Sequence, residues 1–264
     1  MPRASAIRLT PLALGLLAAV PAARAQEAGP IATDRPGFAF NPTVVPQGAF
    51  QVEIGTPFVT RFNGADDASA TAVSLPTGLR YGLTPRFEVR LNSSVYNSSR
   101  VSDGDDSETV DGFGDVEIGA KYQLLVSDGS SPNLALLPSV IVPTGEDGFT
   151  AGDPVIGLNA SAGLPLPNGL GATFVAGVTI PTADESNATG NFVAVLGRSF
   201  TPVISGYVEA AAFPTDGSTP LFAGAGLAYL VSNTVQIDVS FDVGLNDDAP
   251  DLLGGFGISV RFGR

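Results

Sequence analysis

Val235-Gln236-Ile237-Asp238-Val239-Ser240-Phe241-Asp242-Val243 is the stretch that decides the fold, because its odd-numbered residues are all apolar and its even-numbered residues are all polar. Successive side chains of a β-strand point to opposite faces, so a period of two predicts a strand with one apolar face. The same alternation runs through residues 116–122 and 256–262. These segments predict an all-β protein.

Segments of this kind fill the chain from residue 47 to its end. We predict twelve strands, at 48–62, 69–81, 86–98, 112–125, 133–143, 153–164, 170–181, 190–200, 203–213, 220–230, 235–245 and 251–262. The longer connections between them lie at 63–68, 99–111, 144–152, 182–189, 214–219 and 246–250. Short turns separate these connections, so antiparallel neighbours would place all the long connections at one end. Pro57, Pro76 and Pro138 depart from the pattern, because proline cannot donate a hydrogen bond inside a sheet.

Acidic residues are concentrated in the long connections. We predict that the following residues form an acidic extracellular rim: Asp103, Asp105, Asp106, Glu108, Glu146, Asp147, Asp184, Glu185, Asp247 and Asp248. The oxygen-rich spacing at 103–108 is compatible with a hard cation such as Ca²⁺, although it departs from the EF-hand pattern. A solvated acidic loop is the simpler interpretation, and we predict no metal site.

Composition excludes several classes of function. The 264 residues contain no Cys and no His, which removes the usual catalytic dyads and soft-metal sites, so we predict no enzymatic activity and no cofactor. A carboxylate-only mechanism is the one catalytic route left open. The net charge is −13 and the only lysine is Lys121, so nucleic acid is not an expected partner.

The N-terminus has the pattern of a secretory signal. Residues 1–25 contain Arg3 and Arg8, an apolar stretch at 12–20 and the small-residue cleavage pattern Ala23-Arg24-Ala25. The apolar stretch is too short for a transmembrane anchor. We predict that residues 1–25 are a signal peptide, that 26–46 form a separate N-terminal segment and that 47–264 form the strand-rich domain.

A soluble sandwich would also give alternating strands, with the apolar faces turned inward. Soluble surfaces favour Lys and Glu, however, whereas the polar positions here are rich in Gly, Ser, Ala and paired charges. A membrane barrel turns its apolar side chains to lipid and satisfies all its backbone groups by closing. We therefore predict a transmembrane antiparallel up-and-down β-barrel of about twelve strands, exported to the periplasm and inserted into the bacterial outer membrane.

Strand parity then assigns the charged residues to a face. If apolar residues face lipid, these charged residues line the lumen: Glu53, Arg80, Glu88, Arg90, Asp115, Glu117, Lys121, Arg198, Glu209, Asp238, Asp242 and Arg261. One interpretation is a permeation path whose charges orient a solute. The other is a network of ion pairs that fills and stiffens the barrel, because unpaired charges in a confined space are costly.

Five stretches occur in order along the chain: TDRPGF at 33–38, RYGLTPRFEVR at 80–90, GFGDVEIGAKY at 112–122, PTGE at 143–146 and the stretch 236–251. Together they resemble the outer-membrane family called "putative meta-pathway of phenol degradation". The resemblance implies a transporter-like barrel that passes hydrophobic small molecules. It also singles out the motif Thr33, Asp34, Arg35 and Pro36, which is either a periplasmic tether or a short plug folded into the lumen.

The expected function is that of an outer-membrane channel or facilitator for small hydrophobic or aromatic solutes. The alternative is a closed structural or surface-interaction barrel without solute flux. The expected partners are the solute, outer-membrane lipid, lipopolysaccharide and the barrel-assembly machinery.

Overall fold

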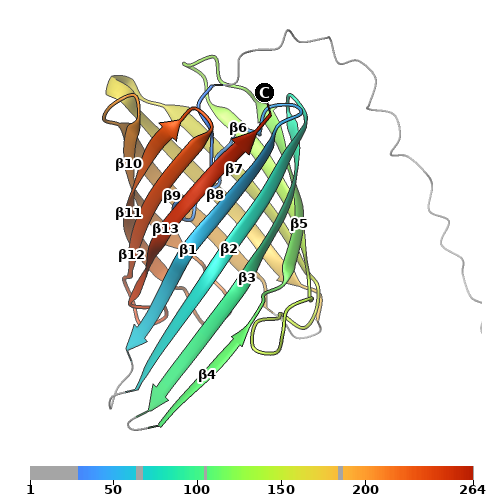
Figure 1. Cartoon of the computed structure of the whole chain (residues 1–264), viewed down its shortest axis with the longest axis vertical. Coiled ribbons are helices and arrows are strands. Elements are labelled where there is room, and N and C mark those ends of the chain that lie inside the picture. The colour runs from blue at the N-terminus through green and yellow to red at the C-terminus, as the bar shows by residue number, and fades with distance from the viewer. Residues whose placement is uncertain (1–28, 64–67, 104–105, 184–186, 264) are drawn as a thin grey trace, which may run out of the picture.

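The computed structural model describes residues 29–63, 68–103, 106–183 and 187–263. Within them, thirteen antiparallel strands form one sheet, which closes into a barrel through the pairing of β2 with β3 (Figure 1). The strands are β1 (Phe50–Asn63), β2 (Ser69–Thr84), β3 (Phe87–Asp103), β4 (Asp106–Gly112), β5 (Val116–Leu125), β6 (Asn133–Val142), β7 (Val155–Pro165), β8 (Leu170–Pro181), β9 (Thr189–Ser199), β10 (Ile204–Ala212), β11 (Leu221–Ser232), β12 (Val235–Gly244) and β13 (Leu252–Phe262). One 3-10 turn, η1 (Pro167–Gly169), joins β7 to β8. The predicted signal peptide, 1–25, lies outside the described residues.

Two of the strands, β4 and β5, share one position in the barrel wall. β3 pairs with β5 through its first part, 87–93, and with β4 through its last part, 97–103. The wall therefore contains twelve strand positions, which confirms the predicted antiparallel barrel and its strand number.

The predicted connection at 99–111 is wrong. β3 continues to Asp103 and β4 returns from Asp106, so this region is a hairpin that projects beyond the rest of the barrel (Figure 1). All the described residues of β4 except Gly112 are exposed. A strand exposed on both faces, as β4 is, has no apolar face to bury, which is why alternation did not reveal the hairpin.

Two of the prolines inside the strands, Pro57 and Pro76, coincide with irregular pairing, whereas Pro138 pairs with Leu158 in regular register. The register between β2 and β3 shifts between Ser74 and Pro76, and the register between β1 and β13 shifts between Thr56 and Phe58, on either side of Pro57. Such shifts are β-bulges, which free a strand position from donating a ladder hydrogen bond. The sheet thus accommodates these prolines without ending the strands.

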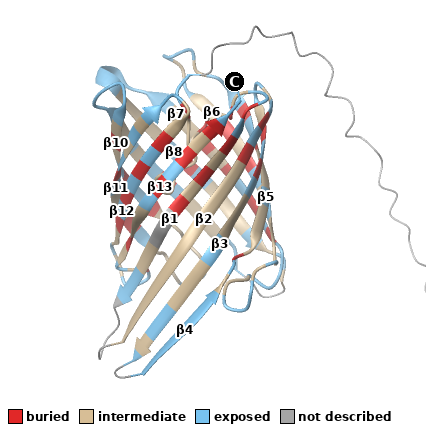
Figure 2. Cartoon of the chain, viewed as in Figure 1, coloured by how far each residue is buried: buried red, intermediate tan, exposed pale blue. Residues whose placement is uncertain are grey.

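The barrel exposes apolar side chains on its outside and buries polar ones within. In β12, Ile237, Val239 and Phe241 are 36–53% exposed, whereas Asp238 and Asp242 are at most 5% exposed. Figure 2 shows the buried positions alternating with less buried ones along the strands. This arrangement is the reverse of a soluble protein and matches a barrel whose outer face meets lipid. No helix in the described ranges has the length and apolar character needed to cross a membrane.

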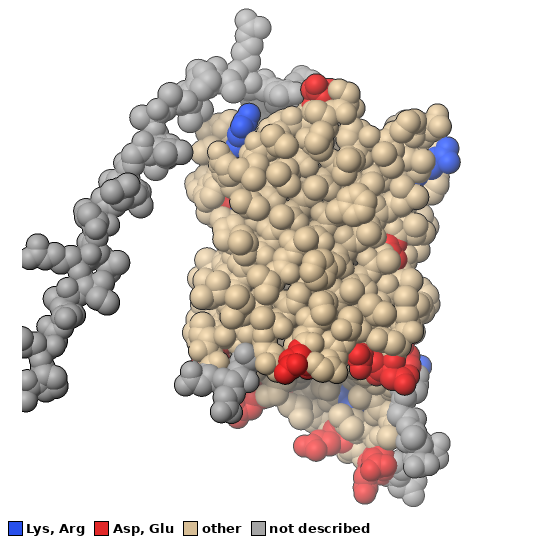
Figure 3. All heavy atoms as spheres, turned by 180° about the vertical axis from the view of Figure 1, so that it is seen from behind, with Lys and Arg blue, Asp and Glu red and all other residues tan. Residues whose placement is uncertain are grey.

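The two ends of the barrel differ in charge. The C-terminus lies at the end that carries the short turns, and the β3–β4 hairpin projects from the other (Figure 1). Acidic side chains gather at this second end on the face shown in Figure 3. Since short periplasmic turns and longer extracellular loops are the rule in outer-membrane barrels, the acidic end is the extracellular end in that arrangement.

The outward apolar face yields a stability prediction. Leu158 of β7 is 50% exposed on this face, so the substitution L158K places an ammonium group against lipid. We expect the free energy of unfolding in phospholipid vesicles to fall by about 2–4 kcal/mol. Urea titration measures this change, with D147K in the exposed β6–β7 connection as the control, expected within about 0.5 kcal/mol of the original protein. An unchanged urea midpoint for L158K would contradict a lipid-facing position.

Candidate functional site

The N-terminal segment, residues 31–46, lies inside the barrel. Ser161 of β7 donates its hydroxyl hydrogen bond to the Phe40 carbonyl oxygen, and the Val45 amide donates to Glu88 Oε2 at 2.6 Å. Gln51 Nε2 donates to the Ala32 carbonyl oxygen at 2.9 Å. The segment is thus tied to inward-facing side chains from several strands.

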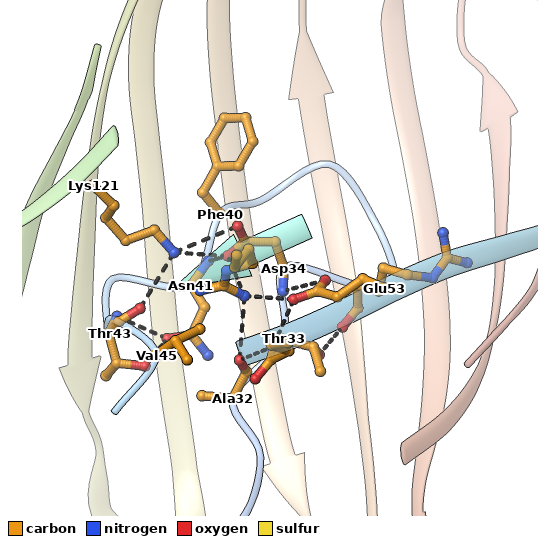
Figure 4. A network of polar contacts seen from close by, with 12 residues as sticks. Ala32, Thr33, Asp34, Phe40, Asn41, Thr43, Val45, Glu53 and Lys121 are labelled. Atoms are coloured by element: carbon orange, nitrogen blue, oxygen red, sulfur yellow. Dashed lines mark hydrogen bonds and ion pairs between the residues drawn. The ribbon is translucent and has the colours of Figure 1, made fainter. Parts of the chain in front are cut away.

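Asp34 is the centre of the polar contacts in this segment (Figure 4). Its carboxylate accepts an ion pair from Arg90 Nη2 at 2.5 Å and one from Lys121 Nζ at 3.0 Å. Arg80 Nη1 lies 3.9 Å from the same carboxylate. These three cationic groups come from β2, β3 and β5, so one carboxylate of the N-terminal segment joins three strands of the wall.

Two glutamates complete this cluster. Arg80 pairs with Glu53 at 2.5 Å and with Glu88 at 2.9 Å, and Lys121 lies 3.6 Å from Glu88. Three basic groups therefore meet three acidic groups, with Asp34 supplying the third acid. All are buried among other protein groups, where a charge needs a partner.

The backbone around Asp34 folds back on its own side chain. The Asn41 amide donates to Asp34 Oδ1 at 2.7 Å, and the Asp34 amide donates to Glu53 Oε2 at 3.0 Å. Burial alone would raise the pKa of Asp34, but the positive charges of Arg80, Arg90 and Lys121 hold it well below its usual range. Asp34 is therefore a carboxylate at neutral pH.

Arg35 binds a different part of the wall from Asp34. Its Nη2 donates to Asp238 Oδ1 at 3.3 Å and to the Phe256 carbonyl oxygen at 3.0 Å. The guanidinium passes over Gly55 and Gly257, where a Cβ would collide with it. Asp34 and Arg35 thus bind different parts of the wall, β2, β3 and β5 for Asp34 and β12 and β13 for Arg35.

Phe38 makes the third attachment. Its amide donates to Glu209 Oε2 at 3.1 Å, and its ring lies 5.3 Å from the rings of both Phe213 and Phe222, measured between centroids. Phe222 belongs to a buried apolar cluster that includes Val175 and parts of β8 to β13. The ring of Phe38 therefore packs in an apolar part of the lumen.

Two cavities border the N-terminal segment. The first, of about 450 Å³, is lined by residues near the short turns, among them Gly169 and Ser199. The second, of about 470 Å³, reaches residues towards the extracellular end, among them Ala151. Asp34, Arg35 and Phe40 border both cavities, so the segment stands between them.

Most of the charged residues assigned to the lumen are buried in the structure. The buried ones are Glu53, Arg80, Glu88, Arg90, Lys121, Glu209, Asp238, Asp242 and Arg261. Asp115 and Glu117 are partly exposed and border the second cavity. Arg198 is different: it is exposed, has the same strand parity as the exposed Leu196, and lies at the border of the first cavity near the short turns. Apolar residues occur at both parities in β9, so alternation could not assign Arg198 to a face.

Residues of the predicted acidic rim lie in three places. The described members, all exposed, are Asp103, Asp106, Glu108, Glu146, Asp147, Asp247 and Asp248. Asp105, Asp184 and Glu185 lie outside the described residues. In the part of the chain that the structure describes, no three acidic side chains are grouped so that they could hold a metal ion.

The apolar contacts of Phe38 were missed by reasoning from sequence. Phe213 and Phe222 belong to strands whose apolar residues were assigned to the lipid face, and Phe222 is 5% exposed. Phe213-Pro214 directly follows β10, and a proline that ends a strand was the one local signal that this ring leaves the regular outward pattern.

Several solved structures are similar to this fold, although no curated protein matches the sequence. The COG4313 outer membrane channel from Pseudomonas putida F1 is 14% identical with a TM-score of 0.66, covering 86% of this chain and 99% of its own. The translocator domain of the autotransporter NalP from Neisseria meningitidis is 13% identical with a TM-score of 0.56, covering 83% and 90%. The KdgM porin in complex with disordered oligogalacturonate is 10% identical with a TM-score of 0.52, covering 81% and 99%.

These likenesses show that the fold is that of bacterial outer-membrane barrels. A family match of the sequence extends over residues 33–262, which include Asp34 and every strand. The chain belongs to the family described as "Putative MetA-pathway of phenol degradation".

Proposed function

We propose that this protein is an outer-membrane channel for small hydrophobic or aromatic solutes, in which residues 31–46 form the constriction. The observation that carries the proposal is the pair of lumen cavities on either side of this segment, both bordered by Asp34, Arg35 and Phe40. A solute that crosses the barrel must pass these residues.

The size and lining of the cavities support a small, partly apolar solute. Volumes of about 450 and 470 Å³ fall in the range of small-molecule sites, about 300–1,000 Å³. Ala39, Phe40 and Val195 line the first cavity, and Pro76 and Ile141 line the second. Each cavity also has charged groups at its border, which suits solutes with one polar group.

The ion cluster around Asp34 favours a second candidate, a closed barrel without flux. Six buried charges hold the segment in place, and breaking such contacts is costly. The two candidates differ in one respect: a channel needs the segment to move or to leave a path, whereas a structural barrel needs it fixed.

Deleting residues 29–44 tests this distinction. We expect the conductance of the refolded barrel in a planar bilayer to rise several-fold, because the two cavities become continuous once the segment between them is absent. The control is a matched deletion-free protein with D153N in the exposed β6–β7 connection, which should conduct like the original. Equal conductance of the deleted and original proteins, both folded by heat-dependent gel mobility, would contradict a constriction formed by this segment.

Neutralising Asp34 tests whether its ion pairs hold the N-terminal segment inside the barrel. D34N removes one acid from a balanced set of six buried charges, so we expect the free energy of unfolding at pH 7 to fall by about 3–5 kcal/mol. D153N, at an exposed position, serves as the control.

The effect of D34N should also depend on pH. Because the folded-state pKa of Asp34 lies below its ordinary value of 3.8, the stabilisation is complete above that value and disappears as the pH falls through the folded-state pKa. Urea midpoints of D34N and the original protein should therefore differ at neutral pH and converge only in strong acid. A difference that is the same at every pH would show that the ionised carboxylate is not the stabilising group.

A further inference from the structure

A pair of acidic side chains, Glu209 and Asp242, lies under the N-terminal segment and takes no part in the Asp34 cluster. Glu209 of β10 pairs with Gly224 of β11, which in turn pairs with Asp242 of β12, so the three residues form one row across the wall. Gly224 has no side chain, and a Cβ there would overlap Asp242 Oδ1. The two carboxyl groups therefore meet above Gly224, within hydrogen-bonding reach of each other.

This pair has no cationic partner among the described residues. Glu209 is 5% exposed and Asp242 is 1% exposed, and neither forms an ion pair with the basic groups that the structure describes. Among the described residues, the Tyr207 hydroxyl is the only side-chain group other than Asp242 within hydrogen-bonding reach of Glu209, and it carries no charge.

The groups that face the pair from neighbouring elements do not neutralise it. Arg35 of the N-terminal segment is paired with Asp238, four residues before Asp242 on β12. Glu53 faces this region from β1 and is paired with Arg80, and Tyr207 of β10 adds a neutral hydroxyl. Facing positions on β11 are Gly224 and Gly226, which carry no charge.

Two carboxylates in contact and shielded from water cannot both be ionised without a large repulsion, and such pairs hold one proton between them. One oxygen of the pair, Glu209 Oε2, accepts the Phe38 amide, and the Gly37 turn rests on the other side of Glu209. Gly37 has φ +90°, and a Cβ there would lie 2.5 Å from Glu209 Oε1 and 2.7 Å from the Tyr207 hydroxyl.

We propose that Glu209 and Asp242 share one proton and that this proton holds the Gly37–Phe38 turn in the lumen, so that its loss loosens the constriction. The step is a simple ionisation: the shared proton passes to water and leaves two carboxylates that repel each other. Asp34 keeps its ion pairs throughout. The segment therefore moves away from Glu209 at Phe38 and stays attached to the wall at Asp34. This inference rests on the proposed role of residues 31–46 as the constriction, and it adds a regulation by pH.

A single tryptophan reports on the segment without any measurement of flux. The chain contains no Trp, so F40W introduces the only one, at a residue that borders both cavities. We expect acrylamide quenching of F40W in the folded barrel to increase about twofold between about pH 5 and about pH 9, as the segment becomes accessible. If F40W does not fold, F38W takes its place in the same measurement.

The matched variants separate the pair from other acids. In F40W/E209Q the amide can accept the Phe38 N–H and donate to Asp242 at every pH, so the increase should disappear. F40W/E117Q changes an acid that borders the second cavity but not the first, and it should keep the increase. Quenching of F40W that is the same at both pH values, or an increase that persists in F40W/E209Q, overturns the proposal. A pH-dependent change in quenching without conductance in any variant would leave the proton-dependent turn standing and remove the proposed channel function.

Discussion

The lumen depends on one constraint: three basic side chains buried inside a barrel need three acids, and the wall supplies only two of them nearby. Glu53 and Glu88 come from β1 and β3, while Asp34 comes from a segment that precedes the first strand. A buried charge without a partner costs several kcal/mol, so the cluster holds the segment inside the barrel. The position of Phe38, the path of Arg35 and the division of the lumen into two cavities follow from that attachment.

The interior consequently has two halves of different chemistry. The half built from β1, β2, β3 and β5 is a neutral network of paired charges around Asp34. The half built from β8 to β13 combines an apolar cluster around Phe222 with the carboxyl groups of Glu209, Asp238 and Asp242. The N-terminal segment bridges the two halves, with Asp34 bound to one and Arg35 and Phe38 bound to the other.

The fold could be predicted because strand parity is a local property of the sequence. The alternation in β12 fixes which residues face outward, and the closed antiparallel barrel follows once every strand has an apolar face. The alternation of apolar and polar residues gives no prediction where both faces of a strand have the same polarity. β4 is exposed on both sides, and β9 carries apolar residues at both parities, so the β3–β4 hairpin and the orientation of Arg198 could not be predicted from alternation.

The candidate site was predicted only in part, for a different reason. Parity could place Arg80, Arg90 and Lys121 on the inner face, but it could not say what would neutralise them. Asp34 and Lys121 are 87 residues apart, and no local pattern links them. The motif around Asp34 fitted a tether or a plug equally well, because the choice depends on partners brought together only by barrel closure. Gly224 is a similar case, since its missing side chain is what lets Glu209 and Asp242 meet.

The most direct test of the central claim is a disulfide between the N-terminal segment and the inner wall. Pro42 Cγ would lie 2.9 Å from a Cβ at Gly163 of β7, and the chain has no other cysteine to interfere. We expect P42C/G163C, folded in lipid and mildly oxidised, to form this disulfide almost completely, as measured by mass spectrometry of the intact protein. Two free thiols in the folded, oxidised barrel would place the segment outside the lumen and contradict its attachment to the inner wall.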